Sequence, residues 1–375
     1  MNYFIFPESD STIYQATGSS NTGLDEILEV TKTMSNSGGN VKVSRVLMKF
    51  DIAEISGSIV DGTITSPKFY LNMYDANSQN LTTSQELYAY PVSSSWVEGE
   101  GTYSDSPATT DGVSWKYRDG ATNANSWSGS ATELEGGAWY SEVYASQSFA
   151  FETDDMRMDV TPIVNKWLDE TYANDGFIIK RSGSFANEDT NTDEGSSERL
   201  GEFRFFSRNT HTIYPPKLEV EWFDTKWSTG SLSALSSTEL EDLSFYMKSL
   251  RPEYKEKSKV KFRIVGRAKY PTKSYSNTAS EYLTVKTLPS GSVENIGGDG
   301  TYYSVKDTQT EDVVVPYGTG SMVSCDSTGN YFNLWLNGLQ SERFYEFEFK
   351  VVSGSNTVDE TIQYYDDEFV FKVVR

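Results

Sequence analysis

Two stretches of sequence decide the fold class of this protein: Ser44-Arg-Val-Leu-Met-Lys-Phe-Asp-Ile52 and Asp159-Val-Thr-Pro-Ile-Val-Asn-Lys-Trp-Leu168. The first is rich in apolar residues and predicts a strand. The second predicts a short helix that starts at Thr161, whose hydroxyl can cap it, with Pro162 at the first position, where a missing N–H costs nothing. Its apolar residues share one face: Ile163, Val164, Trp167 and Leu168. We expect this helix to cap the open end of a β-sandwich.

The rest of the chain predicts strands. Short alternating runs of apolar and polar residues, bounded by Gly, Ser, Asn and Asp, recur along its whole length, and helical periodicity is nearly absent. In Tyr214–Trp222, for example, Leu218 and Val220 alternate with charged residues. The sequence therefore predicts an all-β protein, with enough short strands in residues 1–224 for two sheets packed face to face.

Alternation stops after Asp224, so residues 225–231 are predicted to be a linker and residues 232–375 a second β domain. Its clearest strands are Lys257–Ile264, with cations on one face, and Tyr345–Val351, with carboxylates on one face. We expect these two to be neighbours in one antiparallel sheet, because cross-strand pairing would neutralise both rows of charge.

Composition limits the possible partners. The chain carries 32 basic and 54 acidic side chains, a net charge of −22, which repels phosphates and anionic headgroups, so we predict no nucleic-acid partner. No run of 18 consecutive apolar residues occurs, so no membrane span is predicted. The sequence that follows Met1 lacks the features of a signal peptide, which predicts synthesis in the cytoplasm. The single cysteine, Cys325, excludes an intrachain disulfide.

The residues that usually carry catalysis are scarce. The only histidine, His211, and the only cysteine, Cys325, fall in different predicted domains, so neither has a partner for nucleophilic catalysis nearby in the sequence. Two carboxylate pairs have an aromatic neighbour on which a sugar could stack, Glu98 and Glu100 near Trp96, and Glu133 and Glu135 near Trp139. We interpret them as solvated acids, and we predict no catalytic residue, no enzyme activity and no cofactor.

One acidic segment has the spacing of a calcium loop. Asp189, Asn191 and Asp193 place oxygen ligands at alternate positions. Leu200 stands where an EF-hand would need a bidentate glutamate, so this segment is not an EF-hand. Another kind of calcium site and an acidic loop without metal remain the two interpretations.

The order of motifs resembles the DNRLRE domain family of jelly-roll β-sandwiches. Residues 1–224 contain an Arg strand ending in Phe50-Asp51, then Trp96-Val-Glu-Gly99, Gly112-Val-Ser-Trp115 and a Trp helix before Gly176-Phe177. The stretch Tyr302–Val374 looks like the Ig-like or fibronectin-like β-sandwich of tailed-phage structural proteins. The resemblance implies a non-enzymatic virion protein of a tailed bacteriophage, located in the neck, the tail or a fibre attachment. It also implies a homo-oligomer that contacts other virion proteins.

A carbohydrate-binding module is the alternative function, because jelly rolls often present aromatic rings to sugars. Its candidate ligand-binding residues are Trp96, Glu98, Trp115 and Tyr117, whose rings could equally pack in the interior. A second candidate surface is a basic strip: residues 246–269 hold nine Lys and Arg against two acids. We predict that it contacts an acidic surface of another subunit through Lys257, Lys259, Lys261 and Arg263.

Overall fold

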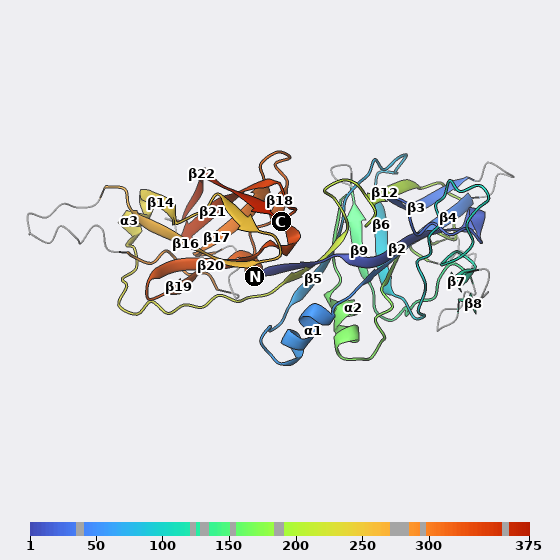
Figure 1. The fold of residues 1–375 in the computed structure, drawn as a ribbon, viewed down its shortest axis with the longest axis horizontal. Coiled ribbons are helices and arrows are strands. Elements are labelled where there is room, and N and C mark those ends of the chain that lie inside the picture. The colour runs from blue at the N-terminus through green and yellow to red at the C-terminus, as the bar shows by residue number, and fades with distance from the viewer. Residues whose placement is uncertain are drawn as a thin grey trace, which may run out of the picture. The chain divides into compact units, whose positions relative to one another are not determined.

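The computed structural model describes residues 1–375 except 35–40, 121–124, 128–134, 151–154, 184–190, 271–284, 293–297 and 355–359. The chain divides into two compact units. The N-terminal unit comprises residues 5–61 and 68–220, and the C-terminal unit comprises residues 1–4, 62–67 and 221–375. Strands dominate both units (Figure 1), so the predicted all-β class is confirmed.

The N-terminal half contains thirteen of the labelled strands. They are β1 (Asn2–Ile5), β2 (Pro7–Tyr14), β3 (Ile27–Met34), β4 (Val41–Phe50), β5 (Lys68–Met73), β6 (Gln85–Pro91), β7 (Tyr117–Asp119), β8 (Asn125–Ser126), β9 (Ala145–Phe149), β10 (Met156–Asp159), β11 (Phe177–Lys180), β12 (Gly201–Phe206) and β13 (Lys217–Glu221). The large sheet has the order β12-β3-β4-β11-β6-β9, with β2 also paired to β4, and a second sheet has the order β1-β13-β5-β10. Burial alternates along β6 and β12, whereas β4 and β11 are buried on both of their faces, so the middle of the large sheet is covered on both sides.

The predicted helix is present as α2 (Thr161–Leu168), at one end of the strands in Figure 1. Trp167 is buried and its ring centroid lies 4.7 Å from that of Phe177 on β11. The predicted capping role of Thr161 is wrong: its hydroxyl accepts a hydrogen bond from the Phe69 N–H (2.9 Å), on β5, instead of from the helix. The helices α1 (Ala53–Val60) and α3 (Ser237–Glu241) and three 3-10 turns, Gln15–Thr17, Thr319–Ser321 and Leu336–Gly338, were not predicted.

The described residues that follow β6 up to Tyr140 form a cover over part of the outer face of the large sheet. Its aromatic residues Trp115, Trp127 and Trp139 pack with sheet residues such as Leu47 and Ile178 in a second core. The buried side chain of Asn21 ties this stretch down: its Nδ2 donates to the carbonyls of Glu98 (2.6 Å) and Val113 (2.8 Å). Gly99, at φ +82°, is required because a Cβ there would lie 2.5 Å from Asn21 Oδ1. The stretch is therefore a packed cover for part of this face of the sheet.

Two sheets form the C-terminal unit as a β-sandwich. Its strands are β14 (Leu243–Lys248), β15 (Glu253–Lys255), β16 (Lys259–Ala268), β17 (Gly300–Asp307), β18 (Val313–Val315), β19 (Ser324–Asp326), β20 (Gly329–Trp335), β21 (Phe344–Ser353) and β22 (Thr361–Val374). One sheet has the order β14-β16-β20-β19 and the other β15-β22-β21-β17-β18. The segment predicted as a linker, residues 225–231, runs beside β19, where the Ser228 N–H donates to the Cys325 carbonyl (3.0 Å).

The predicted pairing of the basic strand with the acidic strand is wrong. The basic strand, β16, pairs with β14 and β20, whereas the acidic strand, β21, pairs with β17 and β22 in the opposite sheet. The two strands meet through their apolar faces, with the rings of Phe262 and Phe347 at 4.8 Å. Each charged row therefore faces solvent on its own sheet. Burying the aromatic rows between the sheets contributes more free energy than exposed ion pairs, which supply only about 0.2–1 kcal/mol each.

No helix in the described parts of the chain is both long enough and apolar enough to cross a membrane.

Candidate functional site

The four residues predicted to bind a sugar do not form one exposed surface. Trp115 is only 4% exposed, and the guanidinium of Arg45 lies 4.8 Å from the centre of its ring. Trp96 is half-buried against the same core, and its Nε1 donates to the Asp175 carbonyl (2.9 Å). Tyr117 lies half-buried on β7, in a short two-stranded sheet with β8. The two tryptophans therefore hold the cover on the sheet, which is the packing interpretation of these rings.

Glu98 has a structural role beside a buried carboxyl group. Its Oε1 accepts from the Asp10 N–H (2.9 Å), and its carboxylate pairs with Arg208 at 3.2 Å. Asp10 is 1% exposed, and its Oδ2 accepts from the Arg208 N–H (2.7 Å). Burial raises the pKa of Asp10 to about 7, an effect that the nearby Glu98 carboxylate increases. These contacts join β2, the cover and the segment after β12 around the buried Asp10, with Arg208 on the solvent side.

A different set of aromatic residues faces solvent on the outer face of the large sheet. Tyr88 and Tyr90 lie two positions apart on β6, so their side chains share one face of the strand, and Tyr144 lies just before the neighbouring strand β9. The ring centroids of Tyr88 and Tyr90 are 6.2 Å apart, and that of Tyr144 lies 5.8 and 5.7 Å from them. Tyr144 is 53% exposed and the other two residues are half-buried. We call these three residues the tyrosine platform.

Polar groups flank the tyrosine platform on the same face. The hydroxyl of Tyr88 donates to Glu86 Oε2 (2.6 Å), two residues earlier on β6. The exposed Ser146 and Ser148 on β9 stand opposite Tyr88 and Glu86 in the strand register, so these four side chains point to one side of the sheet. The hydrogen bond to Glu86 raises the pKa of Tyr88, and burial raises that of Tyr90 to about 12. Both phenols therefore stay protonated donors at neutral pH.

A buried cluster of ion pairs supports the tyrosine platform from below. Glu194 accepts from Arg45 Nε (3.1 Å) and Nη2 (2.5 Å) and lies 3.3 Å from Lys180 Nζ. The ammonium of Lys180 is 5.1 Å from the ring centre of Trp139, which lies 6.2 Å from that of Tyr90. All three charged side chains are at most 1% exposed. The cluster holds Trp139 in position, and Trp139 packs against Tyr90 of the tyrosine platform.

The calcium candidates are only partly described. Asp189 lies outside the described residues, and Asn191 and Asp193 lie in a turn whose backbone is held by the sheet. The Asp193 carbonyl accepts from the ammonium of Lys32, and the next residue, Glu194, is occupied by Arg45. Within the described ranges, no group of three or more His, Cys, Asp or Glu side chains could hold a metal ion. The calcium site stays a prediction.

The basic strip is split between paired and exposed cations. Lys261 Nζ (2.8 Å) and the Arg263 guanidinium (2.7 and 3.0 Å) both bind Asp326, whose pKa these contacts hold far below its usual value. Lys259 lies over the ring of Trp335, with its ammonium 5.4 Å from the centroid. Lys257 is exposed in the turn before β16. Two of the four predicted contact residues, Lys261 and Arg263, are therefore ion-paired within their own sheet.

The two residues considered for catalysis lie in unrelated places. His211 is 89% exposed, with Nε2 3.5 Å from the Glu26 carboxylate. Cys325 is buried on β19, and burial raises the pKa of its thiol, which leaves the thiolate scarce at neutral pH.

The tyrosine platform is absent from the sites predicted above, although part of it has a signal in the sequence. Glu86, Tyr88 and Tyr90 occupy alternate positions between the apolar residues Leu87 and Ala89, so they share the outer face of a strand. The contribution of Tyr144 has no such signal, because only the pairing of β6 with β9 brings it to the other two rings.

A family model matches part of the chain. Residues 2–129 match the family model of carbohydrate-binding module family 96, and no curated protein matches the chain. This finding corrects the resemblance to the DNRLRE family, which is not detected, and it gives no support to a tailed-phage structural role. The predicted virion location and homo-oligomer stay predictions. The matched residues include Tyr88 and Tyr90, so this part of the N-terminal unit is similar to a non-catalytic module that binds carbohydrate.

Proposed function

We propose that this protein binds a polysaccharide through the tyrosine platform of its N-terminal unit. The observation that carries the proposal is the cluster of three contacting, solvent-accessible rings, Tyr88, Tyr90 and Tyr144, beside a carboxylate and two serine hydroxyls. Aromatic faces pack on the C–H faces of sugar rings, and nearby carboxylates and hydroxyls accept and donate hydrogen bonds to sugar hydroxyls.

The rigid support of the rings favours this function. Trp139 is 8% exposed beneath Tyr90, and the Arg45–Glu194–Lys180 cluster holds it in place. A pre-formed surface loses little conformational entropy when a sugar binds. The match to carbohydrate-binding module family 96 over residues 2–129 supports the same function independently of the geometry. We extend the non-catalytic character of that family to the whole chain as part of the proposal.

The test is binding of the full chain to a panel of neutral and acidic polysaccharides, measured by affinity electrophoresis and calorimetry. For the polysaccharide that binds, the double substitution Tyr88→Ala and Tyr144→Ala is expected to weaken binding about ten-fold or more, because losing a stacked ring costs at least about 1.4 kcal/mol. The matched control is Tyr246→Ala, which removes a tyrosine of the C-terminal unit that is 43% exposed. Equal losses in the two variants, or no binding to any member of the panel, would refute the proposal.

A further inference from the structure

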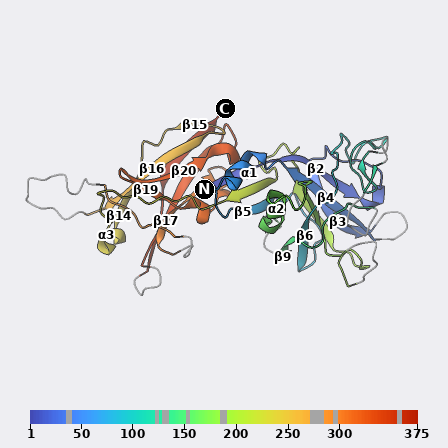
Figure 2. The same cartoon turned by 90° about the horizontal axis from the view of Figure 1, so that it is seen from below.

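The C-terminal unit contains a groove at the place where the chain passes between its two sheets. β14 belongs to one sheet, β15 joins the other by parallel pairing with β22, and β16 returns to the first. The groove between these three strands has a volume of about 780 Å³, within the usual range of ligand sites. Figure 2 shows β15 beside β16 near the C-terminus of the chain.

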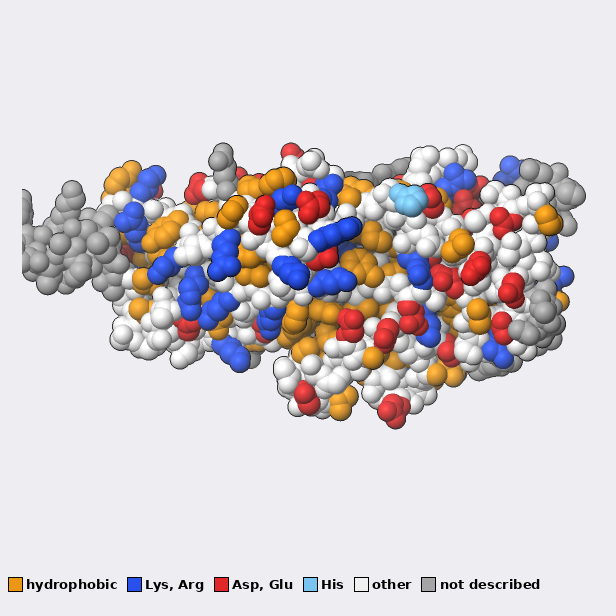
Figure 3. Space-filling view, in the orientation of Figure 1, with side chains coloured by type: hydrophobic (Ala, Val, Ile, Leu, Met, Phe, Trp, Pro, Cys, Tyr) orange, Lys and Arg blue, Asp and Glu red, His pale blue; other side chains and the backbone are white. Residues whose placement is uncertain are grey.

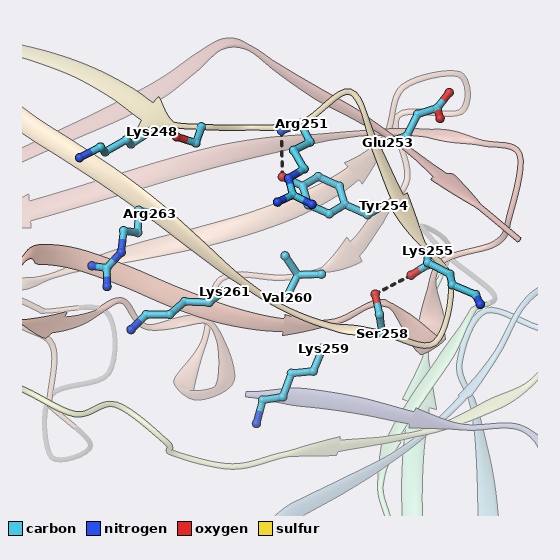
Figure 4. Close-up of a pocket in the computed structure, with 11 residues that line it drawn as sticks. Lys248, Arg251, Glu253, Tyr254, Lys255, Ser258, Lys259, Val260, Lys261 and Arg263 are labelled. Carbon is cyan, nitrogen blue, oxygen red and sulfur yellow. Dashed lines mark hydrogen bonds between the residues drawn. The ribbon is translucent and has the colours of Figure 1, made fainter.

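Cations line this groove. It holds six of them against the single carboxylate of Glu253: Lys248, Arg251, Lys255, Lys259, Lys261 and Arg263. Figure 3 shows Lys and Arg side chains gathered over the C-terminal unit, and Figure 4 shows Lys259, Lys261 and Arg263 pointing the same way from β16. Such a concentration of positive charge is unusual for a chain of net charge −22. At physiological ionic strength the Debye length is about 8 Å, so a ligand in the groove experiences mainly these nearby cations.

Several of these cations are available to a ligand. Lys248, Arg251, Lys255 and Lys259 are exposed, and none of them forms an ion pair with the described parts of the chain. Lys261 and Arg263 share Asp326, so they contribute less net charge. The six cations of the groove thus exceed the two carboxylates of Glu253 and Asp326 by four positive charges.

The groove is pre-formed by contacts within its own walls. The Arg251 N–H donates to the hydroxyl of Tyr254 (2.9 Å), and the Ser258 hydroxyl donates to the Lys255 carbonyl (2.6 Å), as the dashed lines in Figure 4 show. The ring of Tyr254 packs on Phe262 (5.0 Å) and Phe371 (5.7 Å) of the core. The cations therefore project from a backbone that needs no rearrangement to bind.

The kinds of cation indicate the kind of anion. The guanidinium of Arg263 is already filled by Asp326, with Nη1–Oδ1 at 3.0 Å and Nη2–Oδ2 at 2.7 Å, so Arg251 carries the one guanidinium lining the described groove that is available for bidentate recognition of an anion. The available groups are mainly lysine ammonium ions, which act as compact point charges and suit anions whose oxygens point in several directions. Clusters of Lys and Arg of this kind bind nucleic acids and heparin-like polymers. Stacking of nucleic-acid bases is disfavoured because Tyr254, the one aromatic residue lining the described groove, packs against the core.

From this geometry we propose that the groove between β14, β15 and β16 is a second binding site, specific for a sulfated polysaccharide. It lies in a different unit from the tyrosine platform and does not depend on the function proposed there. Binding at this site is electrostatic, so it weakens as salt concentration rises.

The test uses the full chain and dextran sulfate as the probe, with binding measured by fluorescence anisotropy at several salt concentrations. The test variant is Arg251→Gln, Lys255→Gln and Lys259→Gln. The matched control is Lys226→Gln, Arg267→Gln and Lys269→Gln, which removes the same number and kinds of exposed cation from the same unit but outside the groove. Near-ultraviolet circular dichroism of both variants checks that the C-terminal unit remains folded.

We expect the test variant to bind dextran sulfate about ten-fold more weakly and to lower the slope of log affinity against log salt by about two, because three ionic contacts are lost. The matched control, and the variant Tyr88→Ala with Tyr144→Ala, should bind as the unmodified protein does. An equal loss in the matched control would overturn the proposal. Binding of polygalacturonate or single-stranded DNA that is as tight as that of dextran sulfate, or tighter, would also overturn it. If instead the protein self-associates and the groove substitutions abolish this association, the groove binds a second copy of the chain and the proposal is wrong.

Discussion

The buried carboxyl group of Asp10 makes the stability of the N-terminal unit depend on pH. Asp10 is 1% exposed and its pKa is raised from 3.8 to about 7, so the folded protein retains a proton that the unfolded chain releases. The contribution to the free energy of unfolding is fully present below about pH 4. It is lost as the pH rises towards 7, because ionisation then has to occur in a buried site. Raising the pKa of Asp10 from 3.8 to about 7 changes the free energy of unfolding by at most about 4 kcal/mol between these pH values, at about 1.36 kcal/mol for each pH unit.

The substitution Asp10→Asn removes this dependence. An asparagine keeps an oxygen that can accept the Arg208 N–H hydrogen bond (2.7 Å), and its amide needs no ionisation. We compare the free energy of unfolding of the variant with that of the unmodified protein at each pH. We expect this difference to favour the variant by about 1–4 kcal/mol more at pH 8 than at pH 4. The control is Glu142→Gln, which neutralises an exposed carboxylate in the same unit.

The assay is urea unfolding followed by tryptophan fluorescence at pH 4, 6 and 8. This signal reports mainly on the N-terminal unit, because five of the eight tryptophans lie there: Trp96, Trp115, Trp127, Trp139 and Trp167. If the gain of the Asp10→Asn variant is the same at all three pH values, or if it is a loss that grows with pH, then the carboxyl group does not ionise in a buried environment and the reasoning is wrong.

Two further predictions concern stability. Trp167→Ala should lower the free energy of unfolding by about 3–5 kcal/mol, because it empties the space under α2 against Phe177; a change below about 1 kcal/mol in urea unfolding would contradict the packing. Arg45→Met should lower the free energy of unfolding by about 3–5 kcal/mol, because the carboxylate of Glu194, which is 1% exposed, loses its closest partner. Adding Glu194→Gln to this variant should recover part of the loss. A double variant that is less stable than Arg45→Met in the same assay would contradict the role of the ion pair.

The site residues show how far local sequence reasoning reaches. Trp96 and Trp115 are of the residue type that often binds sugars. Whether such a side chain is exposed depends on what packs over it, and here both rings pack against the sheet. Glu86, Tyr88 and Tyr90 could have been found, because strand alternation assigns them to one face. Tyr144 could not, because it joins them only through the register of β6 with β9.

The all-β class, the short helix Thr161–Leu168 and the outward row of cations on β16 follow from the primary structure, because each depends on the period of apolar residues and on local backbone chemistry. Three features depend on contacts between distant segments: β16 and β21 lie in opposite sheets, Trp115, Trp127 and Trp139 are buried, and the cations of β14, β15 and β16 line one groove. The physical reason is that strand partners and loop covers are chosen by non-local burial of apolar area, which contributes more free energy than the exposed charge pairs that a sequence displays.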